Sequence, residues 1–488
     1  MTISDKEEEK IGQAGLSRRQ LLAGSATLFA ASLTACSTAN SSIDRNETAI
    51  RSATGESAVT LPSFSDQRCT HLLTSTVGPE AQRFPAWNTA LRARAAGRES
   101  AFVDLDAVDH NLRLVGDRLG SQIGLRLCAK SLPSLALLEY MMVAACTNRI
   151  MAFSEGMTRD LLLRYGSDVD ILLGRPATVH ALARTFATLD ESGSGPNPSG
   201  SVRWLVDTPD TMQAFAEFAA QRREPVHVSV ELDVGLHRGG ARNAEQLLAM
   251  LKTIDDSDYL RFSGFMGYEG HVPFVSLEVS SPDAEFTAVQ RRYAEFVSLG
   301  REAYPALFEG PLVYNSGGSR TYHYYTEGLD SPVNEVALGS AFFYPSNFHN
   351  LPQQGLRTAT FFATPVLRRL DPAETYPDAD YLPGLAAADR NYEVWYVMTC
   401  GGFPGDRHYP QGLVNTPTSS GDPTRLVNMM PNQGRWLGSR DMPLEVGDFI
   451  FYQPWEADAV RWLAYLDVFR GAELVDQWPT FQPGIQLV

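Results

Sequence analysis

Cysteine is scarce in this sequence, with five residues in 488 and no CxxC pair among them. The spacing of a zinc knuckle or a thioredoxin-type redox site is therefore missing, and the five positions do not determine which cysteines pair. Basic residues are also few, since 41 Lys and Arg stand against 57 Asp and Glu, for a formal net charge of −16. That balance argues against a nucleic-acid partner, because a phosphate backbone requires a basic stripe, and it favours a small organic substrate.

The apolar run near the N-terminus is too short to span a bilayer comfortably as a helix. It follows Arg18 and Arg19, as in a twin-arginine signal peptide, and it ends in LTAC, which resembles a bacterial lipobox with Cys36 as the acylated residue. An amphipathic or buried N-terminal helix is the alternative. We expect a signal peptide over 1–36, a flexible tether over 37–60, and an exported protein, periplasmic or at the cell surface, that contacts the membrane through its lipid alone.

From residue 97 onward, short apolar runs alternate with stretches of helical periodicity, which is the pattern of βα units. The runs predict eight strands, over 124–129, 150–153, 169–173, 202–206, 226–232, 262–268, 312–314 and 335–342. Helices are expected at 104–112, 132–145, 209–221, 243–254 and 282–303. The sequence therefore predicts an α/β fold, a (β/α)8 TIM barrel over 97–350, with function on the loops that follow the strands.

After about residue 350, segments rich in Pro, Gly and Thr contain short alternating runs at 392–398, 448–451 and 464–469. These runs predict a C-terminal mainly-β domain over 351–488, to which residues 61–96 can belong. The Gly/Ser/Pro-rich stretch at 191–201 is expected to be a surface loop.

Lys130 stands where the first barrel strand ends, so its side chain is expected to point into the barrel mouth, where a lysine can act as a Schiff-base nucleophile. A solvated loop lysine is the alternative for this residue taken alone. Later strands end in ELDVGLHRGG (231–240), GYEGH (267–271) and NSGGS (315–319). The Ser/Gly turn, with a second small pair at 339–340, offers donors to a phosphate at the end of the barrel where phosphates commonly bind.

The ordered series DLDAVDHNL, AK, VELDVGLHRGG, GFMGYEGHV, YNSGGSRTY and NEVALGS resembles the pyridoxal-phosphate enzymes of fold type III. This is the alanine racemase N-terminal-domain superfamily, and the similarity is to its branch of D-threonine aldolase and D-serine dehydratase. The resemblance implies that Lys130 carries pyridoxal 5'-phosphate, that Arg238 bonds its phenolic oxygen and that Tyr268 packs against its ring. The phosphate would be held by small residues of the last two strand ends, namely Ser316, Gly317, Gly318, Gly339 and Ser340.

His271 and Glu269 could move protons at the substrate, although a structural histidine bonded to a neighbouring strand is the alternative. The stretch VALG (336–339) lacks the arginine that alanine racemase sets against the pyridine nitrogen, which disfavours an ordinary alanine racemase.

Members of the aldolase and dehydratase branch bind a divalent metal through an HxD or HxC pair, and Glu456 and Asp458 stand at the comparable positions here. Two carboxylates at i and i+2 on a strand would face the same way and could hold Mg²⁺ or Mn²⁺. The alternative is that they are surface acids and the metal has been lost.

The resemblance implies an enzyme of D-amino acids: aldol cleavage or β-elimination of a β-hydroxy-D-amino acid leads, and racemisation or epimerisation follows. A cofactor-free barrel hydrolase that uses Glu231 and Glu269 remains an alternative, as does a lipoprotein that binds its ligand without turnover. A homodimer is expected from the resemblance alone.

Overall fold

The computed structural model describes residues 70, 73, 80–94, 97–132, 134–191, 200–349, 355–371, 382–400, 402–415 and 432–480. They all belong to one compact unit, Thr60–Val488. The expected signal peptide with Cys36, the tether and most of the loop at 191–201 lie outside them. Within the described ranges, no helix combines the length and the apolar character needed to cross a membrane.

Eight parallel strands close into a barrel in the order in which they follow one another along the chain. The ring closes where Gly124 of the first strand lies beside Glu335 of the last. The strands are β2 (Gly124–Cys128), β3 (Arg149–Ala152), β4 (Asp170–Leu173), β5 (Val202–Val206), β6 (Val226–Leu232), β7 (Leu260–Gly267), β8 (Val313–Ser316) and β9 (Glu335–Leu338). The predicted TIM barrel is therefore confirmed.

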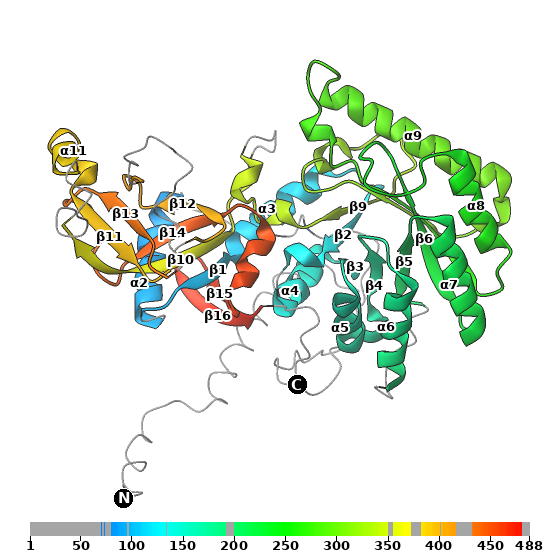
Figure 1. Ribbon diagram of the computed structural model, residues 1–488, viewed down its shortest axis with the longest axis horizontal. Helices are drawn as coiled ribbons and strands as arrows, with labels where there is room; N and C mark the ends of the chain where they lie inside the picture. Colours follow the sequence, from blue (N-terminus) through cyan, green and yellow to red (C-terminus); the bar gives the residue numbers. More distant parts are fainter. Residues whose placement is uncertain are drawn as a thin grey trace, which may run out of the picture. The chain divides into compact units, whose positions relative to one another are not determined.

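The strands β2 to β7 are each followed by an α-helix, and Figure 1 shows these helices on the outside of the strands. They are α4 (Leu135–Ala145), α5 (Glu155–Tyr165), α6 (Val179–Glu191), α7 (Pro209–Arg222), α8 (Ala244–Asp255) and α9 (Pro282–Ala303). Several begin at a capping side chain: Ser154, Thr208, Asn243 and Ser281 each accept a bond from the backbone N–H three residues ahead.

Two expected boundaries are wrong in a way that matters for the site. The helix expected from residue 132 starts at Leu135, because Ala129–Ser131 form a 3₁₀ turn, η2, directly after β2. The last strand ends at Leu338 rather than 342, because the chain turns at Gly339 into a second 3₁₀ turn, η7 (Ser340–Phe342). Both turns bring short side chains and backbone groups to the end of the barrel.

A buried ion network crosses the barrel interior near the start of its strands. Arg126 on β2 is fully buried and donates to Glu335 on β9 at 2.6 Å and to Asp170 on β4 at 3.2 Å. Arg203 pairs with the same Asp170 at 2.9 Å, and Asn315 donates to Glu335 at 2.9 Å. Because buried charges are tolerated only when they are paired, this network ties the strands β2, β4, β8 and β9 to one register.

The mainly-β part is a sheet in the order β12-β14-β10-β1-β15-β16, and β11 extends it from β10 to β13. Its strands are β1 (Ser100–Asp104), β10 (Thr360–Leu370), β11 (Val394–Met398), β12 (Gly405–Tyr409), β13 (Arg435–Gly438), β14 (Phe449–Pro454), β15 (Tyr465–Arg470) and β16 (Glu473–Pro479). The predicted β domain is thus present, and it also contains β1, which precedes the barrel in sequence.

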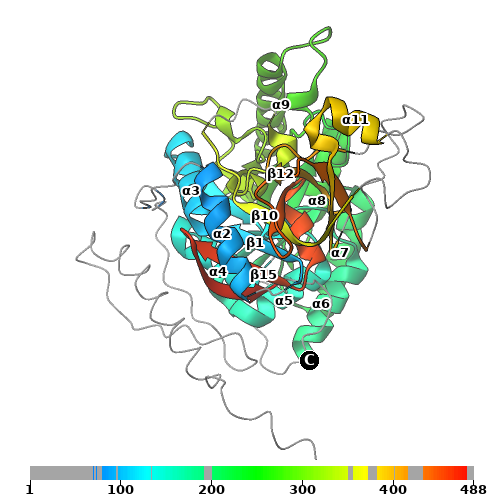
Figure 2. The same cartoon turned by 90° about the vertical axis from the view of Figure 1, so that its left-hand side faces the viewer.

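Helix α2 (Glu80–Arg94) packs on this sheet, and Figure 2 shows it in front of β1, β10 and β15. Its buried residues Phe84, Trp87 and Leu91 join an aromatic core with Phe102, Phe361, Phe449, Phe451 and Phe469. Burial of such large side chains contributes about 1.5–3 kcal/mol each. This segment therefore belongs physically with the C-terminal strands.

The helix before the barrel, α3 (Leu105–Arg118), joins the two parts of the unit. Arg470 at the end of β15 donates to Asp106 at 3.0 Å and to Asp109 at 2.6 Å, both on α3. It also donates to the Tyr140 hydroxyl on α4 at 2.7 Å. The sheet is therefore fixed against two helices of the barrel, and residues of both parts can line one site.

Candidate active site

A cavity of about 220 Å³ lies at the carboxyl ends of the barrel strands. Its wall comes from the ends of β2, β3, β4, β7, β8 and β9, together with one residue of the β domain, Glu456. The charged side chains of the wall are Lys130, Arg238, Arg320 and Glu456, so three cations face one carboxylate. A site of this balance suits an anionic ligand.

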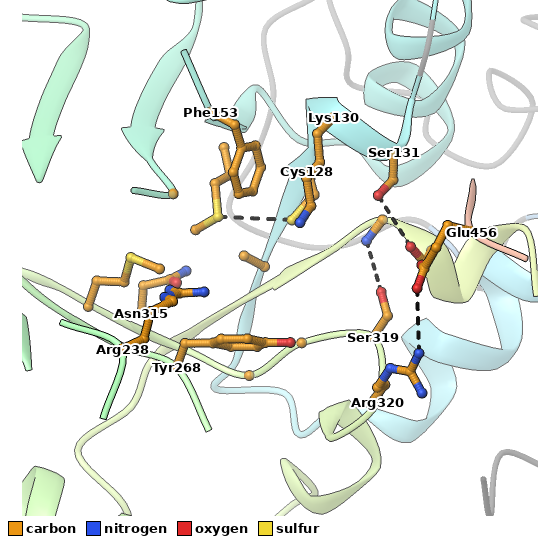
Figure 3. Close-up of a pocket in the computed structure, with 18 of the residues that line it drawn as sticks. Cys128, Lys130, Ser131, Phe153, Arg238, Tyr268, Asn315, Ser319, Arg320 and Glu456 are labelled. Carbon is orange, nitrogen blue, oxygen red and sulfur yellow. Dashed lines mark hydrogen bonds and ion pairs between the residues drawn. The ribbon is translucent and has the colours of Figure 1, made fainter. Parts of the chain in front are cut away.

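Lys130 sits on the η2 turn and lines the cavity, into which its exposed side chain extends. In Figure 3 it lies beside Phe153 and above Tyr268. Its Nζ lies 4.6 Å from the centroid of the Phe153 ring, which is within the range of a cation–π contact. Burial raises the pKa of the adjacent Cys128 to about 12, against the opposing effect of Lys130, so that thiol stays uncharged. Of these two neighbouring side chains, the Lys130 amine is therefore the better candidate for a nucleophile.

The Tyr268 ring forms the opposite wall, with the Arg238 guanidinium 5.3 Å from its centroid. A Cβ on Gly318 would lie 2.7 Å from the ring, so only glycine at 318 leaves the ring in this position. Burial raises the pKa of Tyr268 to about 12, with Glu269 and Cys128 adding to the shift. The phenol is therefore protonated at neutral pH and can donate a hydrogen bond but not act as a base.

Arg238 reaches the cavity from the loop after β6, and its Nη2 lies 3.5 Å from Glu231 Oε1. Burial raises the pKa of Glu231, and the neighbouring Arg238 guanidinium opposes that shift. Since half of the Arg238 side chain is exposed, its remaining donors are available to an anionic oxygen in the cavity.

Short side chains of three strand ends meet on one side of the cavity. Ser131 Oγ lies 3.3 Å from Ser340 Oγ, and the Gly339 N–H donates to Ser319 Oγ at 3.2 Å. A Cβ on Gly339 would lie 2.6 Å from Ser131 Cβ, so the close approach requires glycine. Hydroxyls and backbone N–H groups at this density can cradle a phosphate. Of the residues predicted for this role, Gly317, Gly318, Gly339 and Ser340 line the cavity.

Ser316 is not among the cavity residues, because its hydroxyl donates to Glu269 at 2.7 Å. Glu269 is fully buried and also accepts from Gly317 N at 3.1 Å, Thr321 Oγ1 at 2.6 Å and the Tyr325 hydroxyl at 3.1 Å. The side chain expected to move protons therefore anchors the loop after β8 instead. A hydrolase that uses Glu231 and Glu269 is not supported by this cavity, since neither carboxylate is among the residues that line it.

His271 is placed outside the cavity wall, where its Nε2 lies 3.1 Å from Glu285 Oε1 on α9. A Cβ on Gly235 would lie 2.9 Å from that nitrogen, so the imidazole fills the space between the loops after β6 and β7. The geometry fits the alternative of a structural histidine. A role at the substrate stays a prediction without a contact to support it.

The expected strand geometry of Glu456 and Asp458 is wrong. Strand β14 ends at Pro454, and residues 457–462 form the 3₁₀ helix η10. Glu456 turns to Arg320 and accepts a bond from Asn347, whereas Asp458 pairs with Arg461 at 3.2 Å. Among the described residues, no three His, Cys, Asp or Glu side chains come together as metal ligands. These two carboxylates therefore do not fit a shared divalent cation.

Several cavity residues were not predicted as site residues, among them Ser131, Phe153 and Arg320. Ser131 directly follows Lys130, and Arg320 directly follows the Ser/Gly turn, so their positions in these turns were the signal that could have identified them. Phe153 gives no such signal, because an aromatic residue at a strand end is ordinary core in most barrels.

The chain matches the family model described as "Alanine racemase, N-terminal domain" over residues 103–346, which is half of the 488 residues. Among curated proteins it is 26% identical over 259 residues to D-threo-3-hydroxyaspartate dehydratase of Delftia sp. (strain HT23). That alignment covers 52% of this chain and 62% of the dehydratase, less than two thirds of its length.

Solved structures share the fold. The Delftia dehydratase superposes with a TM-score of 0.58 at 19% identity, covering 80% of this chain and 99% of that one. D-threonine aldolase from Filomicrobium marinum gives 0.57 at 16% identity, over 78% and 96% of the two chains. Alanine racemase of Clostridium difficile 630 gives 0.56 at 14% identity, over 79% and 99%. Because the family model matches the whole barrel, the chain belongs to the alanine racemase N-terminal-domain family.

Proposed function

We propose that this protein is a pyridoxal-phosphate-dependent lyase of β-hydroxy-D-amino acids. The observation that carries the proposal is the position of the Lys130 amine, which shares one cavity with the Arg238 guanidinium and the Ser/Gly turns of β8 and β9. Membership of the alanine racemase N-terminal-domain family supports the cofactor, and the named relatives, a dehydratase and an aldolase, support the lyase class.

The residues present fit the cofactor. Lys130 offers the amine for its aldehyde, Arg238 a cation for its phenolate oxygen, and Tyr268 a flat apolar surface for its ring. The close approach of Gly339 to Ser131, which leaves no room for a Cβ, lies beside the neighbouring hydroxyls of Ser131 and Ser340, which can donate to the phosphate. Bound pyridoxal phosphate would supply an electron sink for the bond broken at the substrate's Cα.

The chain's own groups then divide the remaining work. The Lys130 amine can hold or return a proton at Cα, because it extends into the cavity and its neighbour Phe153 limits its orientation. Tyr268 acts as a neutral donor, since burial raises its pKa to about 12. The Glu269 anchor keeps the turn at 316–321 in place, so that the turn needs little reorganisation when an anion binds beside it.

The products of a panel of D- and L-amino acids test the proposal. β-Elimination from D-serine or a 3-hydroxy-D-aspartate releases a 2-oxo acid and ammonia, whereas aldol cleavage of D-threonine releases glycine and acetaldehyde. We expect one of these product pairs from D-substrates, and none with Lys130→Ala. Formation of the L-enantiomer without cleavage would instead establish the racemase alternative, and no reaction with any substrate would leave a binding protein.

We further propose that the protein is exported and anchored through an acylated Cys36. The twin-arginine pair and the LTAC sequence support this. Cys146 is disulfide-bonded, and disulfides are typical of oxidising compartments. Labelling with a fatty-acid probe should mark the wild type and not Cys36→Ala, and a labelled variant would contradict the assignment.

A homodimer is proposed on the loop after β7, where Phe274, Leu277 and Val279 are 65%, 81% and 83% exposed. Exposed apolar side chains so close in sequence commonly mark an interface. The mass measured by light scattering should be twice that of one chain, and Leu277→Asp should reduce it to a single chain. A monomeric wild type would contradict this assembly.

A further inference from the structure

The Arg320 guanidinium stands in the cavity with a carboxylate of its own chain as partner. Its Nη2 lies 3.7 Å from Glu456 Oε1, and its Nη1 donates to the Asn347 carbonyl at 3.3 Å. Figure 3 shows the two side chains facing each other at one side of the cavity, near Ser319. A guanidinium has five N–H donors, so these contacts leave room for a further anion.

Arg320 is held rigidly. It lies over the rings of Phe348 at 4.4 Å and Phe274 at 5.1 Å, measured to the centroids. Its backbone belongs to the turn that Glu269 anchors through Gly317 and Thr321. The side chain is only 17% exposed. The cation is therefore placed before any ligand arrives, and its ordering costs little on binding.

The pairing with Glu456 is loose by comparison. A strong charge-assisted hydrogen bond has a donor–acceptor distance of about 2.7–2.9 Å, and the distance here is 3.7 Å. Glu456 comes from the β domain and its side chain is 53% exposed, so water can hydrate the carboxylate once it leaves Arg320. An external carboxylate can therefore displace Glu456 without leaving a buried charge unpaired.

We propose that Arg320 binds a carboxylate of the substrate, and that Glu456 occupies this cation until the substrate displaces it. The inference rests on the proposed function and specifies how its site selects a substrate. It also explains why the divalent cation expected from the resemblance does not fit, because the guanidinium already supplies a positive charge where Glu456 points.

Malonate, a dicarboxylate without an amine, is the probe, and its binding is measured by calorimetry on the cofactor-free and the cofactor-loaded protein. Arg320→Gln should weaken malonate binding about 10- to 100-fold, as expected for loss of a charged hydrogen-bond donor pair. Glu456→Gln keeps the acceptor for Asn347 and removes the competing charge, so malonate should bind about 2- to 5-fold more tightly.

Asp458→Asn is the matched control, since it removes one negative charge only two residues from Glu456, and Asp458 pairs with Arg461 outside the cavity. Its malonate affinity should equal that of the wild type. Equal gains in Asp458→Asn and Glu456→Gln would show a general charge effect and overturn the proposal, as would unchanged malonate binding in Arg320→Gln.

Further arms separate the sources of the anion. Weaker binding of inorganic phosphate or of the cofactor, with malonate unaffected, would assign Arg320 to the phosphate and overturn the proposal. A KM increase for D-serine and 3-hydroxy-D-aspartate alike assigns Arg320 to the α-carboxylate, and an increase for the dicarboxylic substrate alone assigns it to the side chain. Because malonate binding to the cofactor-free chain needs no turnover, the proposal can fail or hold independently of the lyase assignment.

Discussion

Replacement of Glu269 by Gln tests whether this buried carboxylate anchors the turn after β8 or moves protons. Its Oε2 accepts from Ser316 Oγ at 2.7 Å and Gly317 N at 3.1 Å, and its Oε1 accepts from Thr321 Oγ1 and the Tyr325 hydroxyl. The backbone N–H of Gly317 must donate, whereas the hydroxyls can rotate to accept. The new amide nitrogen should therefore replace Oε1 and keep most of the contacts.

Glu269→Gln replaces hydrogen bonds to a charged carboxylate by bonds to a neutral amide, so the unfolding free energy should fall by about 1.5–3 kcal/mol. Glu269→Ala leaves four donors facing an empty, buried space and should cost more, about 4 kcal/mol or above. Urea unfolding, monitored by tryptophan fluorescence, measures both values. The dissociation constant of pyridoxal phosphate should rise in parallel, because the turn after β8 lines the cofactor's site.

The reasoning would be refuted if Glu269→Gln kept the stability and the cofactor affinity of the wild type but lost turnover, with one limb of its pH–rate profile missing. That outcome would identify a proton carrier. Glu285→Gln provides a comparison, because it removes a carboxylate bound to His271 outside the cavity and should change neither the cofactor affinity nor that profile.

Three further predictions concern the barrel and the metal. Arg126→Met leaves the buried Glu335 without its nearest cation and Asp170 with Arg203 alone, so the unfolding free energy should fall by about 3–5 kcal/mol in urea titrations. A change below about 1 kcal/mol would contradict the role given to the network. Burial would raise the pKa of Asp170, but Arg126 and Arg203 hold this pKa below its usual range. The carboxylate should therefore contribute fully to the unfolding free energy above about pH 4, and this contribution should be lost as the pH falls further. In acid titrations monitored by circular dichroism, the stability of Asp170→Asn should fall less steeply with pH than that of the wild type. Treatment of the purified protein with a chelator should leave turnover unchanged, because Glu456 and Asp458 point to different partners; activity that disappears and returns with Mn²⁺, Mg²⁺ or Zn²⁺ would contradict this.

Much of the barrel could be predicted because its strands are short apolar runs bounded by polar turns, and α9 was predicted at its observed limits, Pro282–Ala303. The place of β1 could not, because Ser100–Asp104 reads like the opening of the barrel, and only its pairing with β10 and β15 assigns it to the other sheet. A strand's partners depend on contacts that are distant in sequence, which local patterns do not contain.

The site shows the same division. Residue type and order predicted that Lys130, Arg238, Tyr268 and the glycine turns meet at one end of the barrel, and all of them line the cavity there. The direction of a side chain at a turn was not predictable: Ser316 and Ser319 are close in one loop, yet one faces Glu269 and the other the cavity. The Glu456 and Asp458 pair failed for a similar reason, since the strand that would have aligned them ends at Pro454.

Identification of the lysine that carries the cofactor tests the central claim most directly. Purified protein loaded with pyridoxal phosphate is reduced with borohydride, digested, and mapped by mass spectrometry. A phosphopyridoxyl group should be found on Lys130 at one per chain, and Lys130→Ala should lack both this adduct and the visible absorption band of the bound cofactor. An adduct on another lysine, or an unchanged absorption band in the variant, would contradict the account.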